Sequence, residues 1–225
     1  MKRYLLILPM LLLAVCTYSQ ELSQVIFSGG ATLSSISYIT DQKVVIRISE
    51  DGKVLEWGTD PGPGRYNYYS GKLQPFMARV DYYGPESDSM TRGKVKSIGT
   101  CTISYYGAYE TDTKRGKVKM IGTVSFDYYA SYENLANQGK IKSAGYTLFD
   151  YYASFENEML RGKLKTLGST AITYYSSFDD KIIKGKVKSI GSFNYIWYTS
   201  HDDYPGGLKS GQMIQNINGV TYILR

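Results

Sequence analysis

Residues 116–138 read GKVKMIGTVSFDYYASYENLANQ, and variants of this 23-residue segment fill the middle of the chain. The segment recurs without gaps, because a glycine followed by lysine returns at a fixed interval. These glycines are Gly93, Gly116, Gly139, Gly162 and Gly185. A fixed period of this length predicts a repeat architecture in which each unit packs against its neighbours. Two degenerate copies precede the array with irregular spacing, at Gly52 and Gly71.

Within each unit, which we number from its glycine as position 0, apolar residues follow the pattern of a β-strand. Positions 2, 10 and 12 are apolar or aromatic in every copy, and position 16 holds Tyr, Phe or His. Even spacing places side chains on one face of a strand. Positions 1 and 3 hold lysine, and position 17 is always acidic. The pattern predicts a short strand, a glycine turn, a longer strand and a polar turn.

The lysine columns separate the β-repeat architectures from one another. In a parallel solenoid, equivalent lysines would stack about 4.8 Å apart and repel by about 0.8 kcal/mol per neighbour even in water. In an antiparallel array another strand intervenes, and the acidic column can offset the lysines. We therefore predict an all-β fold of tandem antiparallel β-hairpin repeats that form an elongated meander sheet. A closed barrel, a propeller and a β-solenoid are the alternatives.

Hairpin signals flank the array on both sides. Asp51-Gly52 and Asn218-Gly219 each lie between two apolar runs, which predicts type I′ turns. The C-terminal hairpin lacks the lysine columns, so we expect it to cap the array. The predicted organisation is a signal peptide (1–19), an N-terminal β region with a hairpin and a Pro/Gly loop (20–70), a degenerate repeat (71–92), five repeats (93–207) and the capping hairpin (208–225).

The N-terminus has the features of a secretory signal peptide. A basic start, an apolar stretch over residues 4–15 and small residues before Gln20 predict export and cleavage at that point. The destination is the periplasm, the outer membrane surface or the exterior. Lipidation at Cys16 is less favoured, because valine fits poorly before a lipidated cysteine. Cleavage would leave Cys101 as the single cysteine, so no internal disulfide is expected.

Several residues of one unit stand at the spacing of a known repeat. Gly116-Lys117, Gly122, Phe126 and Tyr132-Glu133 give the unit a resemblance to MORN repeats (membrane occupation and recognition nexus), which are also 23-residue β-hairpins. The resemblance covers approximately residues 93–202. It departs from MORN in the doubled tyrosine, in the missing glycine at position 4 and in the missing Asp-Gly turn. The resemblance implies hairpin geometry and a scaffold role, and MORN proteins have been linked to membrane contact.

The composition argues against most catalytic and metal chemistry. The chain has one histidine, which removes histidine clusters and most histidine-based catalysis. We expect His201 to be a structural ring, because it stands in the aromatic column at position 16. We expect Cys101 to be a buried small residue, and Asp179-Asp180 and Asp202-Asp203 to be solvated turn residues, with calcium binding as the alternative. No catalytic residue, metal or cofactor is predicted.

Paired aromatics at positions 12 and 13 are the predicted binding residues. One ring of each pair can pack while the other is exposed, which suits stacking on sugars or docking a protein. The pairs are Tyr105 and Tyr106, Tyr128 and Tyr129, Tyr151 and Tyr152, Tyr174 and Tyr175, and Trp197 and Tyr198.

We therefore predict a non-catalytic, exported scaffold or binding module of a bacterial cell envelope. Its expected partner is an envelope glycan or protein; peripheral membrane contact and end-to-end self-association remain open, and nucleic acid is not expected. The alternatives are an enzyme with a carboxylate site near Glu56 or Asp60, and an outer-membrane-associated β-barrel.

Overall fold

The computed structural model describes residues 21–61 and 72–225, and every regular element in these ranges is a β-strand. The predicted all-β fold of antiparallel hairpin repeats is confirmed. The predicted signal peptide, Cys16 and most of the predicted Pro/Gly loop lie outside the described residues. Within the described ranges, no helix has the length and apolar character needed to cross a membrane.

The repeats form an open sheet of 11 strands in chain order, with β5 and β15 at its edges. The first four units each contribute a short strand from positions 2–5 and a longer one from positions 8–12, in the predicted order, and in the fifth unit the second strand is divided after Asn194. The strands are β5 (Val80–Tyr82), β6 (Val95–Ile98), β7 (Cys101–Tyr105), β8 (Val118–Ile121), β9 (Val124–Tyr128), β10 (Ile141–Ala144), β11 (Thr147–Tyr151), β12 (Leu164–Leu167), β13 (Thr170–Tyr174), β14 (Val187–Ile190) and β15 (Phe193–Asn194). Beside it, β16 (Ile196–Trp197) pairs with β17 (Leu208–Ser210).

Both flanking regions join in a second sheet of six strands, ordered β18-β19-β1-β2-β3-β4. Its strands are β1 (Glu21–Ser28), β2 (Thr32–Ile39), β3 (Val44–Ile48), β4 (Val54–Thr59), β18 (Ile214–Ile217) and β19 (Val220–Leu224). We expected the C-terminal hairpin to cap the array, but β19 pairs in parallel with β1 instead. The two flanks of the array therefore form one terminal sheet.

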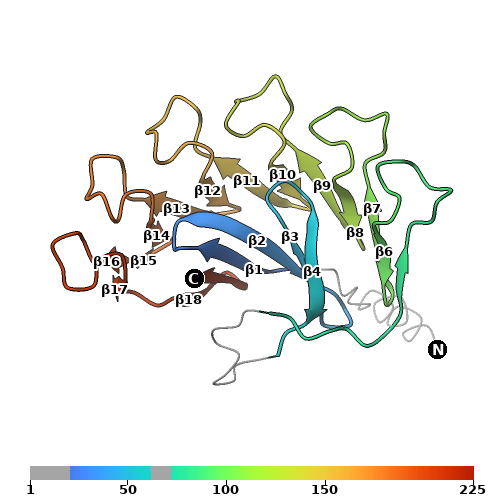
Figure 1. Cartoon of the computed structure of the whole chain (residues 1–225), viewed down its shortest axis with the longest axis horizontal. Coiled ribbons are helices and arrows are strands. Elements are labelled where there is room, and N and C mark those ends of the chain that lie inside the picture. The colour runs from blue at the N-terminus through green and yellow to red at the C-terminus, as the bar shows by residue number, and fades with distance from the viewer. Residues whose placement is uncertain (1–20, 62–71) are drawn as a thin grey trace, which may run out of the picture.

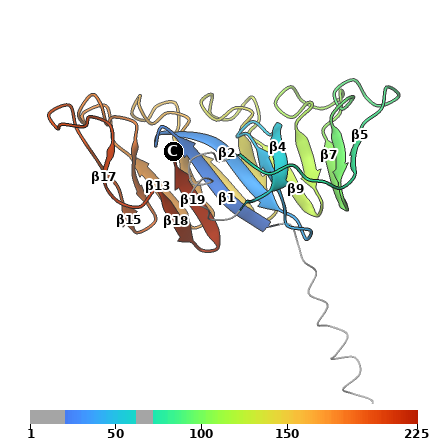
Figure 2. The same cartoon turned by 60° about the horizontal axis from the view of Figure 1, so that its bottom comes forward.

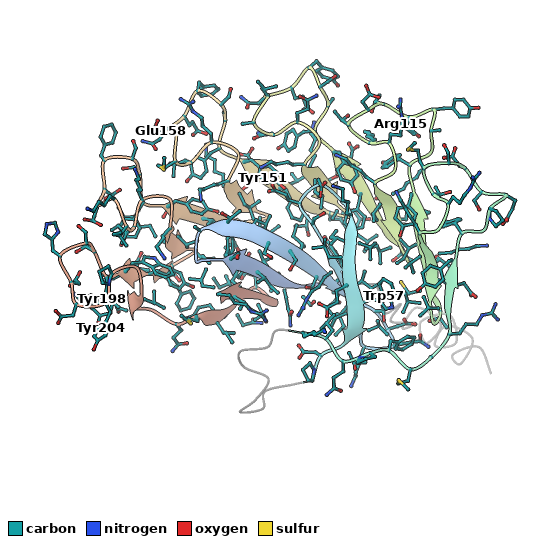
Figure 3. The ribbon with its side chains drawn as sticks, viewed as in Figure 1. Trp57, Arg115, Tyr151, Glu158, Tyr198 and Tyr204 are labelled. Atoms are coloured by element: carbon teal, nitrogen blue, oxygen red, sulfur yellow. The ribbon has the colours of Figure 1, made fainter. Side chains whose placement is uncertain are left out.

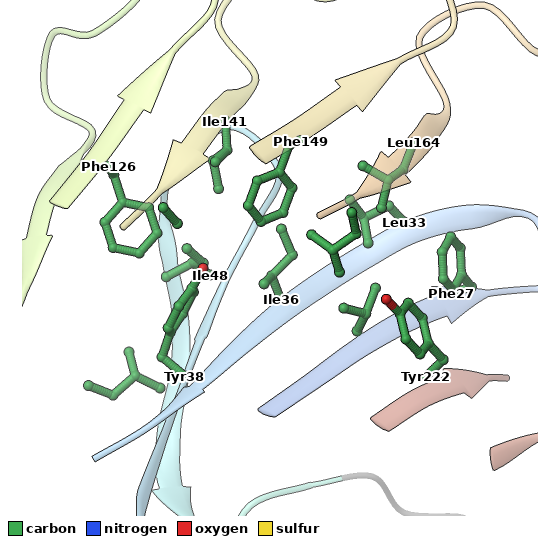
Figure 4. Close-up of a cluster of buried hydrophobic side chains, with 14 of the residues drawn as sticks. Phe27, Leu33, Ile36, Tyr38, Ile48, Phe126, Ile141, Phe149, Leu164 and Tyr222 are labelled. Atoms are coloured by element: carbon green, nitrogen blue, oxygen red, sulfur yellow. The ribbon is translucent and has the colours of Figure 1, made fainter. Parts of the chain in front are cut away.

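The repeat sheet bends into an arc, and the terminal sheet lies in its concavity (Figures 1 and 2). Buried side chains from both sheets fill the space between them (Figure 4). Tyr38 of β2, for example, meets Phe126 of β9 edge to face, with ring centroids 5.2 Å apart. Since the inner residues at positions 2, 5, 10 and 12 of the repeats are almost all buried, the terminal sheet removes the apolar side of the array from water.

Glycines at the hairpin turns allow either a positive φ or a close approach to an aromatic ring. Asn218 and Gly219 both have positive φ, as a type I′ turn requires, whereas only Gly52 does so in the first hairpin, which excludes type I′ there. Gly52 has a further reason to lack a side chain. A Cβ at this residue would lie 2.0 Å from the hydroxyl of Tyr128, and one at Gly30 would lie 2.2 Å from the ring of Trp197. Two hairpin tips of the terminal sheet thus fit directly beneath aromatic rings of the repeats.

The lysines at position 1 connect each unit to the next. The first four donate a hydrogen bond from the ammonium to the carbonyl of the opening glycine of the following unit, and the fifth donates to the Gly206 carbonyl near the end of its own unit. Each lysine also lies over the position-12 ring of its own unit, 4.2–5.1 Å from the ring centroid. These lysines are Lys94, Lys117, Lys140, Lys163 and Lys186. Burial lowers the pKa of Lys163 and Lys186. We expected the acidic column to offset these lysines, but at position 1 their hydrogen bonds make them a structural ladder.

Three of these lysines also hold the terminal sheet. Lys163 donates to the carbonyl of Ala31 at 2.8 Å, and Lys186 donates to that of Gly29 at 3.2 Å. Lys140 forms an ion pair with Glu50 at 3.2 Å. These acceptors lie at the two hairpin tips of the terminal sheet. The lysine ladder therefore fixes both the spacing of the repeats and the position of the terminal sheet against the repeat sheet.

We predict that Lys163→Met lowers the free energy of unfolding by about 3 kcal/mol, since hydrogen bonds from a charged donor contribute about 1.5–3 kcal/mol each and two are lost. The matched control is Lys165→Met, two residues further along the chain, which removes a surface ion pair with Glu156 and a contact with the Tyr152 ring. That change should cost about 1 kcal/mol or less. Urea unfolding measures both values. Equal losses in the two variants would contradict a structural role for the ladder.

Candidate functional site

The first ring of each predicted pair, at position 12, belongs to the core. Tyr105, Tyr128, Tyr151, Tyr174 and Trp197 are all buried. Tyr128 and Tyr174 donate their hydroxyls to the carbonyl at position 2 of their own units, and Trp197 donates its indole N–H in the same way. Burial raises the pKa of the tyrosines in this column. These side chains are placed to join the two strands of a unit.

The second ring of each pair, at position 13, is half-buried, although we expected it to be exposed. Its hydroxyl donates to a carbonyl 20 residues later, at 2.8–3.1 Å, in Tyr106, Tyr129, Tyr152 and Tyr175. Tyr106, Tyr129 and Tyr152 also meet the position-12 ring of the next unit edge to face, with centroids 5.9–6.1 Å apart. Burial, followed by the nearby Asp150 carboxylate, raises the pKa of Tyr129 to about 12. The pairs therefore join successive units, and their predicted role as a contact face stays a prediction.

The aromatic column at position 16 lies elsewhere than expected. The sequence pattern placed these rings on the inward face of a strand, and the structure shows that this prediction is wrong. The side chains stand on the loops that connect successive units, where the four carbocyclic rings keep 83–103% of their accessible surface. His201, expected to be a structural ring, is 89% exposed. We call these five side chains the tip row: Tyr109, Tyr132, Phe155, Phe178 and His201.

Four of these five loops are closed by their own acidic residue at position 17, namely Glu133, Glu156, Asp179 and Asp202. The carboxylate accepts a hydrogen bond from the backbone N–H three residues earlier, as in Glu133 with Ala130 at 2.6 Å and Asp202 with Thr199 at 2.7 Å. A lysine of the next strand pairs with it in three loops, at 2.6–3.1 Å. We predicted that the acidic column lies near the lysine columns, and these three ion pairs confirm it for three loops. Hydrogen bonds from Thr199 and then Lys209 lower the pKa of Asp202 to about 2.

Neighbouring loops are also tied to one another. In three of the units, the side chain at position 18 accepts a hydrogen bond from the backbone N–H at position 15 of the next loop. Asn134 binds Ser154 at 3.0 Å, Asn157 binds Ser177 at 3.2 Å, and Asp180 binds Ser200 at 3.0 Å. Asp179, Asp180 and Asp202 therefore serve as ties within and between loops.

The tip row therefore lies on an edge of the molecule whose loops are held by hydrogen bonds within and between them. Figure 3 shows Arg115 and Glu158 out on these loops, whereas Tyr151 lies among the strands. The fold gains no burial from the tip rings, yet it fixes the backbone on both sides of each one. Large exposed apolar side chains that recur along one edge of a protein are candidates for an interaction site.

The carboxylates of the alternative enzyme hypothesis lie on the terminal sheet. Glu56 and Arg47 line a cavity of about 320 Å³. Glu56 accepts from Arg47 at 2.7 Å and from the backbone N–H of Leu73 at 2.9 Å, so both of its oxygens are engaged. Asp60 accepts from Gln24 at 2.9 Å. These contacts tie strands and the following segment together.

The other candidate residues are placed as follows. Cys101 is buried as expected, and burial followed by the Asp41 charge raises the pKa of its thiol to about 11, which disfavours the reactive thiolate. In residues 21–61 and 72–225, no three or more His, Cys, Asp or Glu side chains are grouped so that they could hold a metal ion. No family model, curated protein or solved structure matches this chain.

The sequence did contain a signal for the tip row. Positions 14 and 15 hold only Gly, Ala, Ser or Thr, and position 18 holds Asn, Asp or Thr. Small and polar residues of this kind end a strand and favour a turn. An aromatic residue within such a run lies in a turn and not in a strand. Its even spacing from the strand residues therefore does not place it on their inward face.

We predict different outcomes for two tyrosines only three residues apart. Tyr129→Phe removes the bond to the Phe149 carbonyl and should cost about 1 kcal/mol of unfolding free energy. Tyr132→Phe alters an exposed hydroxyl and should change stability by less than about 0.5 kcal/mol. Thermal or urea unfolding compares the two variants. If Tyr132→Phe destabilises as much as Tyr129→Phe, the tip ring has a structural role, which would contradict its assignment as a side chain that the fold does not use.

Proposed function

We propose that this chain is an exported, non-catalytic binding module of a bacterial cell envelope, which contacts an extended partner along its tip row. The features of a signal peptide in the first 19 residues support export. The single observation that carries the binding role is the tip row itself: five equivalent, exposed aromatic or imidazole side chains on loops that are braced internally and to one another.

The bracing favours binding over a passive role for the loops. Ordering a loop on binding costs free energy, and a loop already fixed by hydrogen bonds avoids that cost. Aromatic side chains add a large contact area with few rotatable bonds. A partner that touches several loops at once would gain further, because each contact after the first is intramolecular.

The tip row also replaces the paired aromatics as the favoured contact face. The position-13 hydroxyls already donate to carbonyls of the next unit, so a ligand would have to compete with these bonds. The four carbocyclic tip rings, by contrast, keep 83–103% of their accessible surface open to a partner. A scaffold role, which the MORN resemblance implies, is compatible with this proposal, because a repeat array presents equivalent sites at regular intervals.

The proposal is tested by sedimentation of the purified chain with insoluble envelope fractions of the native cell. Replacing Tyr109, Tyr132, Phe155 and Phe178 together by Ala should abolish retention and leave the unfolding midpoint within a few degrees of the parent. The control replaces Tyr146 and Leu148 by Ala, which are 106% and 64% exposed and lie away from the loops. This control should bind as the parent does.

Unchanged retention of the fourfold variant would overturn the tip row as the contact face. If Tyr152→Phe and Tyr175→Phe removed binding instead, the contact face would be the paired aromatics. Loss of retention in the Tyr146 and Leu148 control as well would mean that exposed apolar surface in general causes the sedimentation, and this outcome would also contradict the proposal.

A further inference from the structure

The charge of the loop edge restricts what the tip row can bind. The chain as a whole is basic, with a formal net charge of +6. The six loops over residues 84–92, 107–115, 130–138, 153–161, 176–184 and 199–207 nevertheless contain 11 carboxylates against six lysines and arginines. Three of these carboxylates pair with lysines of the strands, and an acidic excess remains. The net positive charge of the chain therefore comes from residues outside these loops.

This distribution opposes an anionic partner. Phosphodiester chains, acidic polysaccharides and anionic lipid headgroups would all approach the tip row through carboxylates of the same sign. Exposed Asp112, Glu158 and Asp203 lie on the same loops as tip rings. Their carboxylates accept hydrogen bonds from neutral hydroxyls about as well as from water. A partner rich in hydroxyl groups can therefore replace the water molecules bound to them.

The spacing of the row favours a polymer over a folded protein. Equivalent residues are two strands apart, which corresponds to about 10 Å at the sheet. The surroundings of each ring are also nearly the same, with a small residue before it and an acidic residue after it in every loop from Tyr109 to His201. A chain of identical units can make the same contact at each loop, whereas the surface of a folded protein does not repeat at such an interval.

We infer that the tip row binds a neutral polysaccharide, with sugar rings stacked on the aromatic side chains and sugar hydroxyls donating to the loop carboxylates. This inference rests on the proposed function and names the class of its partner. The apolar CH face of a pyranose ring matches an exposed aromatic ring, and its hydroxyl edge matches the acidic and small polar residues on either side. Successive loops would contact successive segments of one glycan chain.

Chemical treatment of the envelope fraction tests the inference for any glycan that carries vicinal diols, without the need to identify it. Periodate cleaves the vicinal diols of sugars, protease removes proteins, and chloroform–methanol removes lipids. Periodate should reduce retention of the parent chain at least tenfold, whereas protease and solvent extraction should leave it unchanged. Retention should also change by less than twofold between 50 and 500 mM NaCl, because a neutral partner makes no charge pairs to be screened.

A defined panel of polymers gives the second readout. Hydroxyethyl cellulose, dextran, mannan and xylan serve as neutral probes, carboxymethyl cellulose and alginate as acidic ones, and phosphatidylglycerol vesicles as an anionic membrane. Affinity electrophoresis should show a shift with at least one neutral polymer. Its tetrasaccharide should bind about a hundredfold more weakly than the polymer, since linked contacts raise the effective concentration. Phe155→Ala should weaken polymer binding about tenfold, and Tyr146→Ala should not.

The outcomes separate this inference from the proposed function. If retention depends on the tip row but survives periodate and is lost on protease treatment, the partner is a protein; the inference then fails and the proposed function stands. Preferred binding to the acidic polymers or the vesicles would also overturn the inference. If the fourfold tip variant binds the envelope as well as the parent does, the proposed function fails and the inference fails with it.

Discussion

The bent repeat sheet has an apolar inner face, and the rest of the structure depends on covering it. An open sheet of 11 strands would otherwise expose a continuous row of Val, Ile, Phe and Tyr side chains to water. The terminal sheet covers this face, and it draws its strands from both flanks of the repeats. The parallel pair of β1 and β19 closes this arrangement, because it joins chain segments almost 200 residues apart. The repeats therefore differ from an open-ended array, in which each unit contacts only its neighbours.

Once the inner face is covered, polar groups set the distance between units. The lysines at position 1 carry the bonds from unit to unit, and the tyrosines at position 13 carry a second set of bonds across the same gap. Lys163 illustrates how the two tasks combine, since one ammonium bonds Gly185 of the next unit and Ala31 of the terminal sheet. Hydrogen bonds from position-2 amides to the hairpin tips add to this, as Val118 donates to Gly52 and Val187 to Gly30. With the strands held in this way, the loops can display side chains that take no part in the fold.

Much of this fold is predictable from one unit of sequence, and the reasons for the failures are physical. The period, the strand–turn–strand order and the hairpin at Asn218-Gly219 follow from local patterns and are present in the structure. The pairing of β19 with β1 is a non-local choice that no local pattern encodes. The structural role of Lys94 and its equivalents could not be predicted either. The sequence pattern of a lysine near aromatic residues is the same whether its ammonium is solvated or donates a hydrogen bond to a carbonyl. The tip row was missed because even spacing from Tyr128 to Tyr132 continues across a turn, where it no longer defines a face.

The central claim is that the repeat sheet and the terminal sheet are one cooperative unit that holds the tip row in place. Native-state hydrogen exchange tests it most directly. The amides of Val118, Ile141 and Val187, which donate to the hairpin tips of the terminal sheet, should share one opening free energy with the amides of β2, equal to that of global unfolding. A gradient of protection that falls from one end of the array to the other, with β1–β4 opening separately, would contradict the account.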